Sequence, residues 1–259
     1  MLTTPKRHNL NKILILNPKG GCGKSTLAVN LAASYAMRGP APTLMDHDPQ
    51  GSAMAWLERR PDGLPRIHGI AAYKNTMHAT RSWQLRVPAE SLNLIVDSPA
   101  ALGHDDLREL TRDATSILVP VLPSAMDIHA ASRCVADLLL VAKVDRRERK
   151  LAVVANRTRK HTKSFSKLMR FLDSLGIPII AALRDSQNFV HSAELGIGIH
   201  EMQPSRVRPD LDEIDKIVAW LDAWTERRVD RGAVTGNRPG PFSRLSMLRG
   251  KGPYVTSAT

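Results

Sequence analysis

A glycine-rich segment near the amino terminus lies between a short apolar run and a helical pattern. It has the sequence Asn17-Pro18-Lys19-Gly20-Gly21-Cys22-Gly23-Lys24-Ser25-Thr26 and directly follows the apolar run Ile13 to Leu16. Glycines let the backbone curl so that successive N–H groups point at phosphate oxygens, and the following helix adds the positive end of its dipole. The segment therefore predicts a strand, a phosphate-binding loop and a helix, in this order.

Short apolar runs recur along the 259 residues and alternate with longer helical patterns. This alternation is typical of βαβ units around a parallel sheet whose two faces are covered by helices. We therefore expect an α/β fold of the P-loop NTPase kind, with a predominantly parallel, twisted sheet flanked by helices on both faces. The expected strands are Ile13 to Leu16, Thr43 to Met45, Leu92 to Val96, Ile117 to Val121, Leu151 to Ala155 and Ile177 to Ala182.

Two stretches depart from this alternation. Between Trp56 and Glu90 several prolines interrupt the pattern, so loops and short helices are expected there. After about Val229 the composition shifts to Gly, Pro, Arg and Ser with little periodicity, which is typical of a mobile basic tail. We therefore expect one domain over residues 1–228 and a tail over residues 229–259.

The composition limits the kinds of partner and compartment. There are 37 Lys and Arg against 25 Asp and Glu, a formal charge of +12. Such an excess favours polyanionic partners, nucleic acid or an acidic membrane surface, with an Arg-rich proteome as the alternative explanation. Cys22 and Cys134 are too few for a disulfide framework and form no CxxC pair, so a reducing cytoplasm is expected. The first apolar run is too short for a signal peptide or a membrane span.

Two aspartate motifs follow other expected strands. Asp46-His47-Asp48-Pro49-Gln50-Gly51-Ser52 follows the second expected strand, and Asp97-Ser98-Pro99 follows the third. Because the carboxyl ends of parallel strands meet at one edge of the sheet, both motifs should lie beside the phosphate loop. Carboxylates at that place suit a magnesium-bound triphosphate, so ATP and Mg²⁺ are the expected cofactors. Lys24 would neutralise the β and γ phosphates, and the Ser25 hydroxyl would ligate magnesium.

The glycine-rich loop departs from a standard Walker A motif, because Pro18 stands where glycine is usual and Lys19 follows it. The resulting pattern KGGxGK[ST] resembles the deviant Walker A loop of the ParA/MinD family of ATPases. The aspartate motifs are similar to that family's DxDPQG switch and to its DTP motif, with Ser98 in place of threonine. The resemblance extends from about Lys12 to Trp224. It implies a magnesium-dependent ATPase that forms a homodimer around ATP and is stimulated by a partner.

The resemblance also implies roles for single residues. Lys19 would reach across the dimer interface to the partner's nucleotide, and Asp48 would orient the hydrolytic water. Asn156 would contact the adenine base, with capping of a strand end as an equal alternative. The implied residues are Lys19, Lys24 and Asp48 for catalysis; Lys19, Gly20, Gly21, Cys22, Gly23, Lys24, Ser25, Thr26 and Asn156 for the nucleotide; and Ser25, Asp46 and Asp97, the last through water, for the metal.

ParA-like relatives bind nucleoid DNA without sequence preference, which implies a basic surface and a cytoplasmic, nucleoid-associated protein. MinD-like relatives instead bind membrane through a carboxyl-terminal amphipathic helix. Phe242, Leu245 and Leu248 offer only a short apolar patch among glycines and prolines, so a membrane is the alternative partner. The candidate DNA contacts are Arg157, Arg159, Lys160, Lys163, Lys167, Arg184, Arg206 and Arg208.

Two further runs bear on the cargo. The segments 119–128 and 182–188 resemble the carboxysome-positioning McdA branch of ParA proteins, which implies a small McdB-like adaptor. Plasmid or chromosome cargo with a ParB-like adaptor remains an alternative. A cluster-carrying metallochaperone or reductase would need an interfacial cysteine pair, which Cys22 and Cys134 do not form.

Overall fold

The chain folds around one parallel β-sheet. The computed structural model describes residues 10–74, 87–145 and 150–235, with side chains to residue 223. Within these ranges seven strands lie in the order β3-β2-β4-β1-β5-β6-β7, and every neighbouring pair is parallel. The strands are β1 (Asn11–Ile15), β2 (Thr43–Asp46), β3 (His68–Ala71), β4 (Asn93–Asp97), β5 (Ser116–Val121), β6 (Leu151–Thr158) and β7 (Ile179–Arg184).

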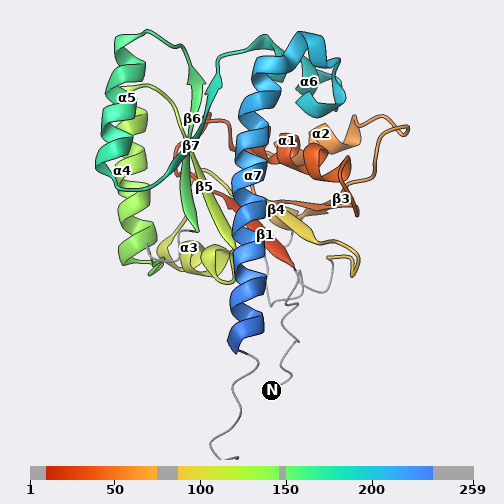
Figure 1. The fold of residues 1–259 in the computed structure, drawn as a ribbon, viewed down its shortest axis with the longest axis horizontal. Helices are drawn as coiled ribbons and strands as arrows, with labels where there is room; N and C mark the ends of the chain where they lie inside the picture. Colours follow the sequence, from red (N-terminus) through yellow and green to blue (C-terminus); the bar gives the residue numbers. More distant parts are fainter. Residues whose placement is uncertain (1–9, 75–86, 146–149, 236–259) are drawn as a thin grey trace, which may run out of the picture.

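Helices cover both faces of the sheet (Figure 1). Successive residues of β1 point to opposite faces, so Ile13 and Ile15 pack in one apolar layer and Leu14 in the other. The first layer includes side chains from α1, α2 and α7, and the second includes side chains from α3, α4 and α5. The helices are α1 (Lys24–Ala36), α2 (Ser52–Glu58), α3 (His104–Thr111), α4 (Ala125–Leu140), α5 (Lys163–Ser174), α6 (Gln187–Glu194) and α7 (Pro204–Thr235), with short 3₁₀ helices η1 (Ala72–Lys74) and η4 (Ile199–Glu201).

The expected fold class is confirmed, and all six expected strands are present with their ends shifted by at most three residues. The prediction missed β3, which lies at one edge of the sheet inside the stretch expected to hold loops and short helices. This strand has four residues, is only partly buried and contains Gly69. A side chain at Gly69 would come within 2.5 Å of Leu57 Cδ2, so close packing against α2 explains the glycine that weakens the strand pattern.

The carboxyl-terminal helix is longer than expected. Helix α7 continues to Thr235, so residues 229–235 are helical where an irregular tail was expected. Only Arg231 and Ala233 in this stretch are good helix formers, so the helix continues here because adding a turn to an existing helix is easier than starting one. The rest of the expected tail, residues 236–259, lies outside the described residues, as do Phe242, Leu245 and Leu248.

Candidate active site

The glycine-rich loop connects β1 to α1 at the carboxyl edge of the sheet. Gly21 and Gly23 have φ angles of 75° and 94°, a left-handed conformation that other residues rarely adopt. A side chain at Gly23 would come within 2.2 Å of Asn156 Nδ2. Gly23 is the N-cap of α1 and has no side chain to satisfy the first N–H groups of the helix, which leaves them for an anion.

Two buried asparagines hold the loop from either end. Asn17 Nδ2 donates to the Pro120 carbonyl at 2.7 Å, and Asn17 Oδ1 accepts from the Lys19 N–H at 2.9 Å. Asn156 Nδ2 donates to the Cys22 carbonyl at 2.8 Å. These bonds tie the loop to β5 and β6, so contacts within the chain stabilise its curled form.

The two loop lysines make different contacts. Lys24 is buried, and its Nζ lies 3.3 Å from the Lys19 carbonyl, so its charge is folded over the loop. Lys19 Nζ lies 2.5 Å from Asp127 Oδ2 in the first turn of α4. In this single subunit the lysine expected to act on a partner's nucleotide is therefore bound to a carboxylate of its own chain.

Asp97 is the main candidate for holding a cation. It is fully buried and lies in register with Ile15 on one side and Asp46 on the other. Within the described residues neither of its carboxylate oxygens has a hydrogen-bond partner. Burial raises the pKa of Asp97 to about 7, while the Ser25 hydroxyl and the charge of Lys24 act in the opposite direction. A buried carboxylate without partners is costly, so this position, with Ser25 nearby, fits a magnesium ion carried by a nucleotide.

Asp46 and Asp48 serve the loop between β2 and α2 in different ways. Asp46 Oδ1 accepts from the Asp48 N–H at 3.0 Å, and Oδ2 accepts from Ala53 at 3.0 Å and Met54 at 3.3 Å. Burial raises the pKa of Asp46, and these N–H donors oppose that shift. Asp46 thus shapes the loop and caps α2. Asp48 is half-buried, and its Oδ1 accepts from the Gln50 N–H at 3.0 Å.

A cavity of about 680 Å³ lies beside the loop at the ends of β6 and β7. Its lining includes Gly23 and Thr26 of the loop region and Asn156 and Arg157 of β6. Arg157 has a left-handed φ of 47°, at a bulge where β6 slips in register against β7. This volume and place suit the nucleoside part of a nucleotide. Asn156 lies in the wall of this cavity, while its amide also binds the loop.

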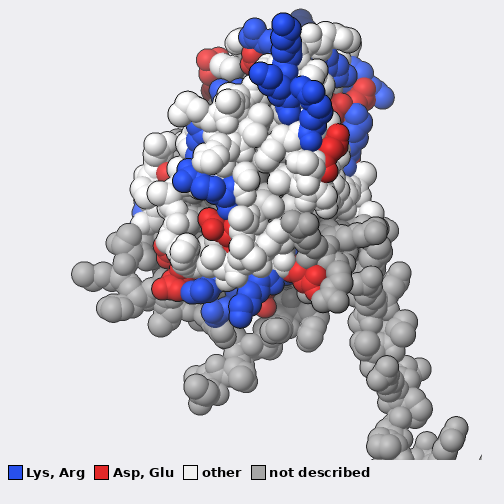
Figure 2. Space-filling view, turned by 90° about the vertical axis from the view of Figure 1, so that its left-hand side faces the viewer, with Lys and Arg blue, Asp and Glu red and all other residues white. Residues whose placement is uncertain are grey.

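The expected DNA contacts fall into two groups. Five exposed residues lie in the last residues of β6, just after it or on α5, and we call them the basic edge: Arg157 in β6, Arg159 and Lys160 after it, and Lys163 and Lys167 on α5. Figure 2 shows Lys and Arg gathered at the top of the molecule, the end at which β6 leads into α5 in Figure 1.

Three expected DNA contacts lie outside the basic edge. Arg184 is exposed, but its Nε and Nη2 donate to buried Asp210 at 2.6 and 2.8 Å. Arg206 and Arg208 are exposed in the first turns of α7, and Arg208 Nε pairs with Asp212 Oδ1 at 3.0 Å. Arg184 therefore has two of its donors engaged within the chain.

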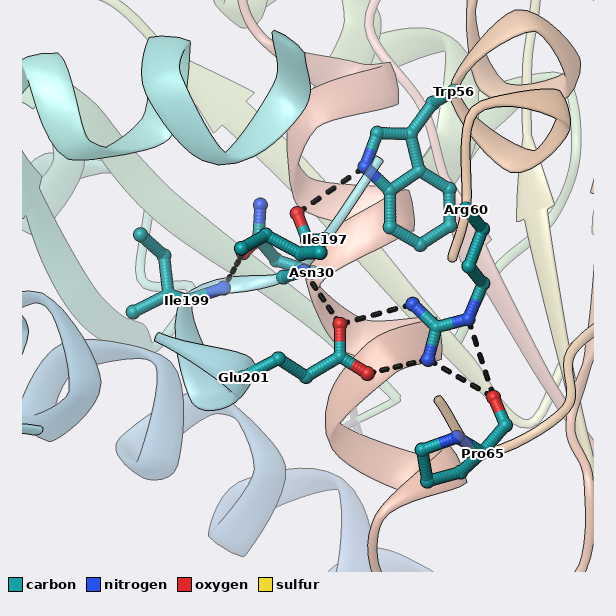
Figure 3. A network of polar contacts seen from close by, with 8 residues as sticks. Asn30, Trp56, Arg60, Pro65, Ile197, Ile199 and Glu201 are labelled. Carbon is teal, nitrogen blue, oxygen red and sulfur yellow. Dashed lines mark hydrogen bonds and ion pairs between the residues drawn. The ribbon is translucent and has the colours of Figure 1, made fainter. Parts of the chain in front are cut away.

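A buried ion pair that the sequence did not suggest lies behind the site (Figure 3). Arg60, just after α2, binds Glu201 of η4 through both terminal nitrogens, and Nη1 lies 2.9 Å from Oε2. Ile199 N donates to Asn30 of α1 at 2.8 Å, and Trp56 Nε1 donates to the Ile197 carbonyl at 3.2 Å. The network thus joins α1, which follows the glycine-rich loop, and α2, which follows Asp48, to the segment before α7. No local pattern marks a contact that spans 141 residues.

The sheet is parallel, and a curled glycine loop follows β1. Lys24 is folded over this loop, and the neighbouring strand β4 carries a buried carboxylate. These features define a P-loop nucleotide-binding protein. The chain belongs to the CobQ/CobB/MinD/ParA nucleotide-binding domain family, whose model matches residues 13–199. It is an ATP-binding ATPase of the ParA/MinD kind. The family and the nucleotide expected from the sequence are thereby confirmed.

Known proteins of this kind resemble the chain over most of its length. It is 26% identical to maintenance of carboxysome distribution protein A of Halothiobacillus neapolitanus over 210 residues, covering 80% of this chain and 94% of that protein. It is 35% identical to the protein of that name from Gloeobacter kilaueensis over 155 residues, or 56% of this chain and 69% of that one. The structure of a variant Cyanothece McdA in complex with ATP has a TM-score of 0.61 at 15% identity, covering 84% of this chain and 96% of the other, and supports the fold alone.

Proposed function

We propose that this protein is an ATP-dependent, dimerising ATPase that binds nucleoid DNA without sequence preference and positions an intracellular cargo. The basic edge beside the nucleotide cavity carries this proposal. Arg157 belongs to both, since it lines the cavity and begins the basic edge. Groups that meet the nucleotide and groups that would meet DNA phosphates thus share one strand end, which gives ATP a direct route to alter DNA binding.

The residues of the site divide the work of phosphoryl transfer. The loop N–H groups and Lys24 bind the phosphates, and Asp48 orients the attacking water. Ser25 and Asp97 would hold magnesium, which supplies charge neutralisation at the phosphates when bound. Asp46 positions Asp48 through the loop between them. Lys19 of a second copy would add positive charge at the terminal phosphate, so ATP would favour the dimer.

For the cargo we propose the carboxysome, brought by a McdB-like adaptor that stimulates ATP turnover. The support is the similarity to two carboxysome distribution proteins. The match to one of them covers 94% of that relative's length. A plasmid or chromosome with a ParB-like adaptor is the alternative cargo. Pull-down of a purified McdB-like protein, compared with a ParB-like one, in the presence of ATP distinguishes the two.

Retention on DNA tests the surface on which the protein acts. Lys160→Ala with Lys163→Ala should weaken ATP-dependent binding to random-sequence duplex DNA about tenfold and lower its salt dependence. Arg108→Ala with Lys216→Ala, which removes two exposed charges elsewhere, is the matched control. Equal DNA binding by wild type and the basic-edge variant would contradict the proposal.

A membrane surface remains the second candidate, as in MinD-like relatives. Among the described residues no helix combines the length and apolarity needed to cross a bilayer. Co-sedimentation with anionic vesicles and with DNA, each with ATP, compares the two surfaces directly. Binding to vesicles but not to DNA would replace the DNA proposal with the membrane one.

A further inference from the structure

The contact between Lys19 and Asp127 is built on a buried carboxylate. The Asp127 side chain is 2% exposed and that of Lys19 is 32% exposed. The Ser124 hydroxyl donates to the same oxygen that binds Lys19, and Asp127 N donates back to Ser124 Oγ at 3.2 Å. The other oxygen, Oδ1, is buried and has no hydrogen-bond partner within the part of the chain that is described. Lys19 is therefore a main counter-charge of this carboxylate.

The side chain of Lys19 is able to leave without unfolding the loop. Its backbone N–H is held separately by Asn17 Oδ1 at 2.9 Å, and its carbonyl accepts from Lys24 Nζ at 3.3 Å. Asn17 in turn binds the Pro120 carbonyl, which leads to the helix that carries Asp127. Only side-chain rotations of Lys19 are needed to exchange one anion for another.

We propose that Asp127 holds Lys19 in its own subunit and opposes dimerisation until ATP on a second copy takes the lysine. This inference rests on the proposed dimer. One ammonium group on this side chain cannot bind Asp127 and reach across the interface at the same time. The fraction of subunits with Lys19 released sets the apparent affinity of the dimer, so Asp127 acts as a positioning residue that makes assembly depend on the terminal phosphate.

Self-association of the full chain tests the exchange. Asp127→Asn keeps the shape and an acceptor for Ser124 but removes the charge. With magnesium and a non-hydrolysable ATP analogue, sedimentation should show a dimer dissociation constant about tenfold lower than that of wild type. Ser124→Ala is the matched control, since it removes the cap but leaves the ion pair, and should not tighten the dimer. In a Lys19→Gln background the Asp127 substitution should give no gain. An unchanged or weaker Asp127→Asn dimer, or an equal gain without Lys19, overturns the proposal.

Chemical labelling tests the contact without requiring a dimer. In nucleotide-free protein, an amine-specific reagent should modify Lys19 several-fold faster in Asp127→Asn than in wild type, with exposed Lys160 as the internal reference. Equal labelling rates would refute the ion pair. A wild type that stays monomeric with the analogue would instead refute the proposed dimer, so the two failures are distinguishable.

Discussion

Glu201→Ala is expected to destabilise the protein strongly. The substitution leaves the Arg60 guanidinium, 6% exposed, without the carboxylate that binds two of its nitrogens. Its remaining described acceptor is the Pro65 carbonyl, at 3.2 Å from Nε and 2.9 Å from Nη2 (Figure 3). Gly198 N also loses its acceptor, Glu201 Oε2, at 2.8 Å.

The magnitude follows from this burial. Removing one member of a buried ion pair costs about 3–5 kcal/mol, because the other charge stays buried without compensation. For a chain of this size, such a loss should lower the Tm by about 10 °C. It would remove a large part of a typical free energy of unfolding of about 5–15 kcal/mol. Asp212→Ala is the matched control, since it breaks an exposed ion pair. The side chains of Arg208 and Asp212 in that pair are 74% and 51% exposed. We expect that change to cost less than about 1 kcal/mol.

Urea unfolding at pH 7, followed by circular dichroism, measures both variants. The midpoint should fall much further for Glu201→Ala than for Asp212→Ala, with the m-value unchanged. Replacing both partners, Arg60→Met with Glu201→Leu, should recover much of the loss because no buried charge remains. Equal midpoints for the two single variants would refute the reasoning, as would a double variant less stable than Glu201→Ala.

Three other substitutions test the site. Lys24→Ala should weaken ATP binding at least about 100-fold by calorimetry, since it removes the charge folded over the loop; unchanged affinity would contradict its role. Asp48→Ala should retain ATP and accumulate as a dimer in sedimentation while hydrolysis stops; a monomer with normal turnover would argue against the assignment. Burial lowers the pKa of His47 to about 4, so the unfolded chain binds the extra proton between about pH 4 and 6.5 and His47 destabilises the fold as pH falls through that window. His47→Gln should therefore lose less free energy of unfolding than wild type when the pH is lowered from 7.5 to 4.5. An equal loss in the two proteins would rule this out.

Local patterns revealed most of the fold and the phosphate loop. The strands other than β3, the loop and the two aspartate motifs each depend on residues close together in the chain, so alternation and spacing were sufficient for them. Asp46 shows where this stops: its position at a strand end was evident, but its bonds to the N–H groups of Ala53 and Met54 required knowing that a helix begins there. The pairs Lys19–Asp127 and Arg60–Glu201 join residues 108 and 141 positions apart, and only tertiary packing brings them together.

The asparagines that hold the glycine loop have a consequence for how the protein distinguishes nucleotides. Because Asn17 and Asn156 hold the loop through bonds within the chain, we expect little ordering entropy to be lost when a nucleotide binds. Such a cradle should accept the phosphates common to ADP and ATP almost equally well. We therefore expect an isolated subunit to discriminate poorly between spent and fresh nucleotide, and selectivity to arise when two copies meet around the third phosphate.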